Sequence, residues 1–435
     1  MIYTLIQFFA SLTLLVVIHE FGHFITAKMF GVRVEKFYIF FNPGFSLFKF
    51  KPKNSDTTYG IGWLPLGGYV KLSGMIDESF DTEQMNEEPK EWEFRTKPAW
   101  QRLIIMVAGV VMNFLLAITI YAGIAFHWGD TYLPFENAKD GMEFCWSAHE
   151  IGFVDGDILV SADGEKLKSL SEKSFRKITD AKTVQVERDG AIVDIAIPDT
   201  FMAMLLREGN GFALYRVPFV AQKIIDGMPA AEAGLQADDR LLTIDGQSVY
   251  LTQAMKQIAS HKNKQMEWSV LRGADTVKLT VTPDVNGKVG VYMKSPYDLY
   301  EMVHVEYSFL ESFPHAIKTA VEKITGYVSD FKYVFTPEGV QSLGGFGSVA
   351  SLFPDSFDFH AFWTITAFLS LVLAFMNFLP IPALDGGHIL FVLIEIITRK
   401  KVSKDVLLKA QMIGVAFLLA LMLFANLNDV FRLFK

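Results

Sequence analysis

The chain contains four apolar stretches that are long enough to cross a lipid bilayer, at residues 2–27, 103–128, 361–394 and 410–428. A membrane-spanning helix needs about 20 largely apolar residues to cross roughly 30 Å of hydrocarbon. The composition agrees, because 51% of the residues are hydrophobic and only 20% are charged. The first stretch lacks the basic leader and small-residue cleavage site of a signal peptide. We therefore expect a polytopic α-helical membrane protein with four transmembrane helices.

Basic residues near the spans predict the orientation. The connection between the third and fourth spans has one acidic residue, Asp405, and its basic residues are Arg399, Lys400, Lys401, Lys404 and Lys409. The positive-inside rule places such a loop in the cytoplasm. The loop 28–102 then shares that side, and both termini and the segment 129–360 face the opposite side. In a bacterial inner membrane that side is the periplasm.

Charge and cysteine content argue against other classes of protein. The net charge of -8 gives no basic excess for binding phosphates, so nucleic acid is not an expected partner. Cys145 is the only cysteine, which excludes an internal disulfide and a zinc site built from several cysteines.

Three segments outside the spans have recognisable patterns. Residues 32–71 are rich in strand-forming side chains punctuated by turn signals, which predicts β-hairpins close to the membrane. The acidic run 77–93 is interpreted as a solvated surface linker. Apolar spacing of three and four residues in 300–335 predicts an amphipathic helix, placed along the membrane surface, against the third span or in an ordinary core.

The large segment between the second and third spans contains an internal repeat. The pattern of Ile151 to Gly164 recurs from Ala233 to Gly246, with a glycine, a turn containing aspartate, an apolar strand and an Asp-Gly hairpin. This pattern resembles the PDZ domain and implies two PDZ-like α+β domains in tandem. PDZ domains bind extended peptides or chain ends by strand addition. Modules that only fill space are an equally good interpretation.

The first span carries the sequence His19-Glu20-Phe21-Gly22-His23, an HExxH motif. Residues four apart lie on one face of a helix, so both imidazoles can bind one zinc ion while Glu20 acts on its bound water. Glu20 is the only acidic residue between 2 and 27, where Lys and Arg are absent. An ionisable group at that depth is costly unless it has a partner, and a metal site provides one.

A catalytic zinc usually takes three protein ligands, so another span must supply the third. Asp385 is the only charged residue between 361 and 394. As one continuous helix that stretch would be about 51 Å long, so the helix is either long and tilted or broken. The residues that place a break around Asp385 are Pro380, Pro382, Gly386 and Gly387. We assign Asp385 as the third ligand.

Three other polar residues have competing interpretations. His388 can replace Asp385 in a site of three histidines, or can simply form a hydrogen bond near the membrane interface. Asn377 can donate to a scissile carbonyl or hold a substrate backbone, or can pack between helices. Helix packing is the stronger interpretation for Asn113 in the second span.

With both halves of this site in view, the sequence resembles the site-2 protease family of intramembrane zinc metalloproteases, in its RseP-like bacterial branch. The resemblance covers nearly the whole chain. It rests on the HExxH motif, the tandem PDZ-like pair, the segment Asn377 to Gly387, and the loop motif Pro65-Leu66-Gly67-Gly68-Tyr69-Val70. Two departures from the family pattern concern glycines: Gly-Pro pairs are replaced by Gly109-Val110 in the second span and by Gly344-Gly345-Phe346-Gly347 before the third.

The resemblance implies roles for individual residues. It implies that His19, His23 and Asp385 bind Zn²⁺ and that Glu20 is the catalytic acid/base. It also implies that Asn377, Gly67 and Gly68 bind substrate, the two glycines within a membrane-associated β-hairpin that pairs with an unwound substrate helix.

The implied function is hydrolysis of peptide bonds inside the membrane. The expected substrates are single-span proteins such as anti-sigma factors, already cut once on the outer side, and remnant signal peptides; membrane lipid surrounds the enzyme. One competing class is an inactive membrane-anchored PDZ scaffold, which has no reason to keep Glu20 and Asp385 in hydrocarbon. Another is a metal transporter, which calls for more intramembrane polar residues and repeated spans.

The expected domain order follows from these assignments. It runs 1–30 (first helix), 31–100 (cytoplasmic loop with the hairpin), 101–128 (second helix), 129–210 and 211–298 (PDZ-like domains), 299–358 (periplasmic amphipathic helical segment), 359–397 (third helix) and 405–432 (fourth helix).

Overall fold

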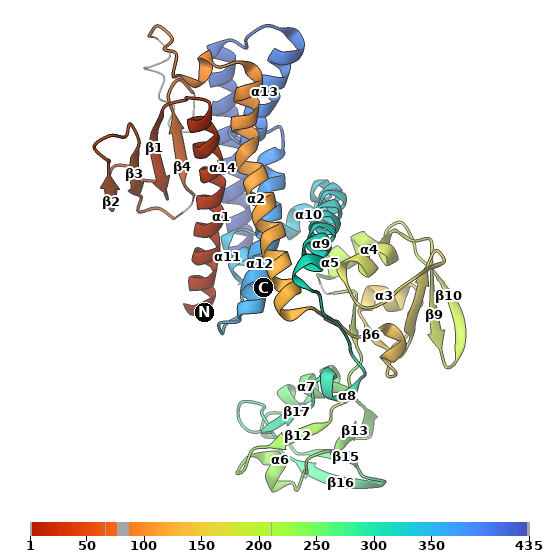
Figure 1. Ribbon diagram of the computed structural model, residues 1–435. Coiled ribbons are helices and arrows are strands. Elements are labelled where there is room, and N and C mark those ends of the chain that lie inside the picture. Colours follow the sequence, from red (N-terminus) through yellow and green to blue (C-terminus); the bar gives the residue numbers. More distant parts are fainter. Residues whose placement is uncertain (1, 66, 76–86, 210, 433–435) are drawn as a thin grey trace. The chain divides into compact units, whose positions relative to one another are not determined.

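The computed structural model describes residues 2–65, 67–75, 87–209 and 211–432 (Figure 1). The chain forms two compact units, one of Met1–Gly129 with Glu306–Lys435 and one of Asp130–Val305. The predicted motif residue Leu66 and residues 77–86 of the acidic run lie outside the described residues.

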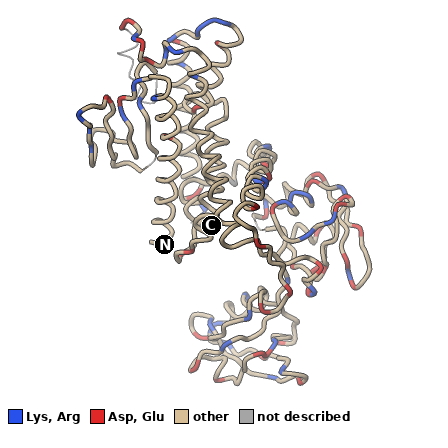
Figure 2. The backbone as a smooth tube through the Cα atoms, viewed as in Figure 1, with Lys and Arg blue, Asp and Glu red and all other residues tan. Residues whose placement is uncertain are grey.

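Within the described residues, four helices of the first unit are long and apolar enough to cross a membrane, as predicted. They are α1 (Ile2–Met29), α2 (Ala99–Trp128), α12 (Phe359–Phe378) and α14 (Lys404–Arg432). Figure 2 shows Lys, Arg, Asp and Glu gathered toward the ends of these helices, with few along their middle. The start of α1 and the end of α14 lie at the same end of the bundle, as an even number of spans requires (Figure 1).

The third apolar stretch is broken. Helix α12 ends at Phe378, and α13 (Asp385–Thr398) begins after a connection that contains Pro380 and Pro382. Proline removes a backbone donor and disfavours helix in the residue before it, so the two prolines end α12 here. Of the two predicted possibilities, a tilted helix or a broken one, the structure shows the broken one.

Helix α2 lies at the centre of the bundle and packs against α1, α12 and α13. Its contact with α1 is close because Gly22 has no side chain: a β-carbon there would lie 2.6 Å from the carbonyl oxygen of Ala108. Close to the C-terminal end of α13, the Arg102 side chain of α2 donates a hydrogen bond to Glu395 at 2.6 Å, which links α2 to α13.

The predicted amphipathic helix is α9 (Phe309–Asp330). Its first turn has a capping box, in which Ser308 Oγ accepts from the Glu311 amide and the Glu311 carboxylate accepts from the Ser308 amide. Its buried residues Ala316 and Ala320 share a cluster with α2 and α12. Helix α9 therefore packs chiefly against α2 and also against α12, the third span. The shorter helices that follow are η4 (Phe331–Phe335), α10 (Pro337–Ser342) and α11 (Phe346–Ala350).

The predicted hairpin region folds as a four-stranded mixed sheet. Its strands are β1 (Val34–Ile39), β2 (Phe48–Phe50), β3 (Thr58–Ile61) and β4 (Tyr69–Leu72), in the order β2-β3-β1-β4, and the short helix η2 (Phe94–Thr96) follows. Strands β2 and β3 form the expected antiparallel hairpin. Strands β1 and β3 are parallel, and β4 returns to pair with β1. The prediction of hairpins is therefore confirmed for β2 and β3, whereas β1 pairs with β3 and β4, because turn signals mark where the chain bends but not which strand it joins.

The second unit contains two modules with the same sheet topology. The first module is built on the sheet β10-β9-β7-β8 and the second on the sheet β14-β13-β15-β16, all antiparallel. The strands are β7 (Ile158–Ala162), β8 (Glu165–Lys166), β9 (Thr183–Arg188), β10 (Ala191–Ala196), β13 (Arg240–Ile244), β14 (Gln247–Ser248), β15 (Met266–Arg272) and β16 (Asp275–Val281). Equivalent helices are α4 (Glu172–Asp180) and α7 (Leu251–Ser260).

An ion pair recurs in the two modules. Arg188 bonds both oxygens of Asp157 at 2.7 Å, and Arg272 bonds those of Asp239 at 2.7 and 2.8 Å. Each arginine also donates to the carbonyl of a repeat glycine, Gly152 or Gly234, at 2.8 Å. The internal repeat thus extends to an arginine that the sequence pattern did not include.

The remaining elements of the second unit complete its two modules, apart from β5 (Asp130–Tyr132) and β18 (Val303–Val305), which pair with each other. The elements that complete the modules are η3 (Phe135–Asn137), β6 (Met142–Phe144), α3 (Trp146–Glu150), α5 (Phe201–Glu208), β11 (Ala213–Tyr215), β12 (Ala221–Ile224), α6 (Pro229–Glu232), β17 (Val291–Met293) and α8 (Pro296–Leu299). Strand β11 pairs with β6, and Phe212 and Ala213 belong to the hydrophobic core of the first module. The first module therefore continues past the predicted boundary at 210, because its closing strand follows α5.

Candidate metal centre

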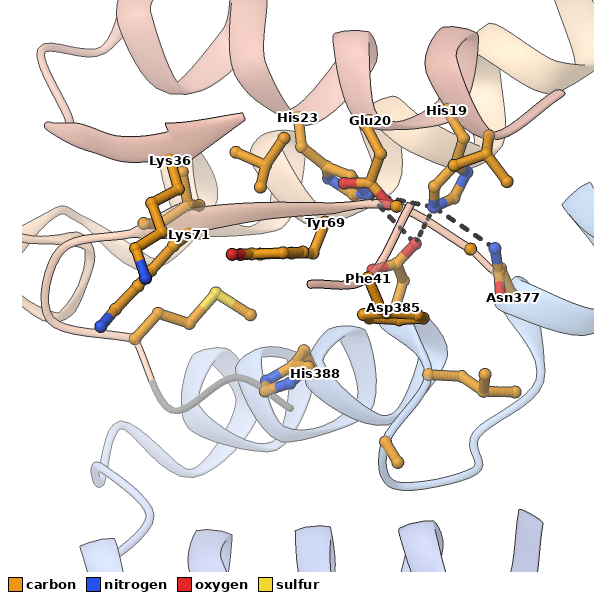
Figure 3. Close-up of a pocket in the computed structure, with 18 of the residues that line it drawn as sticks. His19, Glu20, His23, Lys36, Phe41, Tyr69, Lys71, Asn377, Asp385 and His388 are labelled. Atoms are coloured by element: carbon orange, nitrogen blue, oxygen red, sulfur yellow. Dashed lines mark hydrogen bonds and ion pairs between the residues drawn. The ribbon is translucent and has the colours of Figure 1, made fainter. Parts of the chain in front are cut away.

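The two histidines of the HExxH motif lie on the buried face of α1, and each is less than a tenth exposed. The first residue of α13, Asp385, meets them (Figure 3). Asp385 Oδ2 lies 3.0 Å from His19 Nε2 and 3.2 Å from His23 Nε2. The two Nε2 atoms are 3.3 Å apart. The structure therefore brings together the three residues that the sequence predicts as ligands.

These distances suit zinc. Tetrahedral zinc with bonds of about 2.0–2.1 Å separates its ligand atoms by about 3.3 Å. Two imidazoles and one carboxylate are also a common donor set for a catalytic zinc site, which keeps a further position open. Among the described residues, His19, His23 and Asp385 are the group of metal-binding side chains whose ligand atoms all lie within 4.8 Å.

Glycines bring Asp385 to this position. A β-carbon on Gly386 would lie 2.0 Å from the carbonyl oxygen of Leu379, and one on Gly387 would lie 2.7 Å from that of Ile381. Only residues without side chains allow the first turn of α13 to fold back against the connection 379–384. The break in the span thus carries Asp385 toward α1.

A cavity of about 810 Å³ opens beside the three ligands. It is lined by α1, the strand β4 with the residues before it, and the ends of α12 and α13. Glu20 lines this cavity, as does Val70 of β4. His388 also lines the cavity but is not in the ligand group; Figure 3 shows it on α13, apart from the three ligands.

The substrate residues predicted from the sequence lie around the same cavity. Asn377 points toward the ligands, with its Nδ2 3.3 Å from His19 Nε2 (Figure 3). Gly67 and Gly68 precede β4 and line the cavity too. A β-carbon on Gly68 would lie 2.7 Å from Val16 Cγ1 and 3.6 Å from Glu20 Cγ, so the chain passes directly over α1 here.

Helix α2 contributes contacts that the sequence interpretation missed. A β-carbon on Gly109 would lie 2.4 Å from His23 Nε2 and 2.7 Å from His19 Cε1. The carbonyl of Ile105 lies 2.8 Å from His23 Nδ1, and the side chain of Asn113 lies 3.2 Å from His19 Nδ1. A glycine and an asparagine inside an apolar span were the available signals, but neither indicated which helix it faces.

Comparisons with known proteins agree with this site. A model of peptidase family M50 matches residues 7–421. A protein of Vibrio cholerae is 31% identical over 99% of both chains. The zinc metalloprotease RasP of Bacillus licheniformis is 29% identical and the regulator of sigma E protease of Haemophilus influenzae is 28% identical, each over 99% of both chains. The family expected from the sequence motifs is confirmed, and the chain belongs to peptidase family M50, the site-2 protease family.

Proposed function

We propose that this protein is a zinc-dependent endopeptidase that cleaves transmembrane segments within the membrane. His19, His23 and Asp385 are the zinc ligands in this proposal, and Glu20 is the catalytic acid/base. The observation that carries it is the convergence of the three ligand atoms beside Glu20, in a cavity walled by helices long enough to span a membrane. A buried carboxylate and two imidazoles within membrane-spanning helices are costly unless they have a partner, and a bound metal ion is such a partner.

The chemistry divides between the metal and the chain. Bound zinc would supply a Lewis acid and lower the pKa of a water molecule. Glu20 is placed to take a proton from the attacking water and return it to the leaving amine, because its side chain lines the cavity beside the three ligands. Asn377 supplies an amide donor at the cavity wall for the scissile carbonyl or the substrate backbone.

Substrate unwinding is assigned to strand β4 and the two glycines before it. A helix hides its carbonyls in internal hydrogen bonds, so a transmembrane substrate must become extended before cleavage. Strand β4 is at the edge of its sheet, and it lines the cavity that contains Glu20. Strand addition to β4 would satisfy the substrate backbone while exposing one peptide bond to Glu20. Gly67 and Gly68 let the chain that leads into this edge lie close to Phe41 and to α1.

The basic connection between α13 and α14 supports a cytoplasmic position for that loop and for the β1–β4 sheet. Both termini and the two modules are then periplasmic, in a bacterial inner membrane. We assign the modules as PDZ-like domains on their repeated sequence pattern and shared topology. Their role in the proposal is to exclude substrates with bulky outer domains.

The proposed substrates are single-span membrane proteins of the anti-sigma-factor type, cut once beforehand, and remnant signal peptides. The similarity to a protein named regulator of sigma E protease supports the first class. The competing proposal is a membrane-anchored scaffold that binds partners without cleaving them.

The deciding experiment uses purified full-length protein and a model single-span substrate without an outer domain. We expect the wild type to cleave it and Glu20→Gln to lose about 10²–10⁴-fold in rate while keeping its zinc. Cleavage at the wild-type rate in Glu20→Gln would exclude the assigned mechanism. A zinc-free wild type that binds the substrate without cutting it would identify a scaffold.

A further inference from the structure

One face of α2 contacts both histidines. Ile105, Gly109 and Asn113 are four residues apart and so follow one another along this face. His19 and His23 have the same spacing on α1. Ile105 meets His23, Asn113 meets His19, and Gly109 leaves room between them for both rings.

The contact with Ile105 determines the orientation of His23. A carbonyl oxygen can only accept, so His23 Nδ1 carries the proton and donates to it at 2.8 Å. The lone pair is then on Nε2, which faces Asp385. A metal-binding histidine characteristically donates its other ring N–H to such an acceptor, which fixes the ring and its tautomer.

Asn113 can do the same for His19. Its side chain is fully buried, and its Oδ1 has no hydrogen-bond partner among the described residues. The Nδ2 of the same amide lies 3.2 Å from His19 Nδ1. A half-turn of the amide about its Cβ–Cγ bond exchanges these two atoms. Oδ1 then accepts from Nδ1–H, and the lone pair of His19 lies on Nε2, the atom that faces Asp385.

The side chain of Asn113 is not needed for the hydrogen bond between α2 and α12. That bond is made by its main chain, because Ser370 Oγ donates to the Asn113 carbonyl at 2.7 Å. The hydrogen bond found for the side-chain amide in the described structure is to His19. The amide is therefore available for histidine orientation, in addition to the helix packing predicted for this buried residue.

We propose that Asn113 is a positioning residue of the metal centre, which orients His19 for metal binding by accepting a hydrogen bond from Nδ1–H. The inference rests on the proposed function, since it assumes that His19 is a ligand. Together with the Ile105 carbonyl, Asn113 makes α2 the surface that orients both imidazoles, although α2 itself supplies no ligand.

The test measures metal affinity rather than activity. Full-length wild type, Asn113→Ala and Asn113→Asp are purified without metal and titrated with Zn²⁺ against a chelator. Loss of an outer hydrogen bond to a metal ligand costs about 10–100-fold in affinity. We expect that loss in Asn113→Ala. We expect Asn113→Asp, which keeps an acceptor at the same place, to bind zinc within a few-fold of the wild type.

Ser370→Ala is the matched control, because it removes the neighbouring α2–α12 hydrogen bond but leaves the amide. We expect it to bind zinc like the wild type. The visible spectrum of the Co²⁺-loaded proteins gives a second readout of ligand geometry, in which Asn113→Ala should differ and Asn113→Asp should not. Wild-type affinity in Asn113→Ala, or equal losses in Asn113→Ala and Asn113→Asp, would overturn the inference alone. A wild type that binds no zinc would overturn the proposed function as well.

Discussion

His19 and Asp385, from opposite ends of the chain, meet with 3.0 Å between Nε2 and Oδ2. One lies on the continuous helix α1 and the other on the first turn of α13, just after the break in the third span. The metal centre proposed here therefore depends on two helices that have very different local sequences.

Substitution of Asp385 tests the ligand assignment. We expect Asp385→Ala to lose bound zinc, because two imidazoles alone leave the site one ligand short. His388→Ala should keep its zinc, since His388 lies outside the ligand group. Zinc content of the two purified variants distinguishes the alternatives: a site of three histidines predicts the reverse pattern.

Gly109 should tolerate no side chain. In Gly109→Ala the new methyl group would be 2.4 Å from His23 Nε2, so the imidazoles or the helices must move. We expect zinc affinity to fall at least tenfold, as for other changes that displace a ligand from outside the site. Gly123→Ala is the control on the same helix, because no atom beyond its own stretch of α2 lies within 4 Å of its β-carbon position. Equal zinc affinity in the two variants would show that α2 moves to accommodate the methyl group at Gly109 without displacing the metal ligands.

Gly68 should affect substrate handling without affecting metal binding. A methyl group in Gly68→Ala would lie 2.6 Å from the Tyr38 carbonyl oxygen and 2.7 Å from Val16 Cγ1, which forces the start of β4 away from α1. Misplacement of substrate by about 1 Å costs on the order of 10²-fold in rate. We expect kcat/KM for a single-span substrate to drop by roughly that factor with zinc content unchanged. An unchanged kcat/KM would mean that β4 does not position the substrate.

Acid should weaken the second module through Asp239. Burial alone would raise the pKa of Asp239, but hydrogen bonds from Arg272 and the Gln236 amide outweigh it and lower the pKa below its ordinary value. The stabilisation is therefore present above the unfolded-state pKa of about 3.9 and is lost as the pH falls through the lower, folded-state value. Hydrogen exchange of the β13 and β15 amides in the full chain, corrected for intrinsic rates, should show protection falling in that range. In Asp239→Asn this part of the pH dependence should disappear.

Local patterns in the sequence were sufficient to predict the four apolar spans and the helix that carries the HExxH motif. Hydrophobic length and helical spacing are properties of consecutive residues, so they can be read without knowing what the helix packs against. The same holds for the break at Pro380 and Pro382, because proline acts on its own helix. Asp385 was predictable for a related reason: a charge within an apolar span is costly unless the fold uses it.

Only the tertiary structure decided which surfaces meet. The return of β4 to β1, the closing of the first module by β11, and the approach of Gly109 and Asn113 to the imidazoles all join residues distant in sequence. Turn signals and isolated glycines or asparagines indicate a local backbone conformation, but they do not indicate which distant residue will contact them. The sequence alone therefore determined that the chain has membrane spans and which residues could bind a metal. The packing of α2 against α1 decided how those ligands are oriented, because hydrogen-bond direction and the space for a ring exist only once the helices are together.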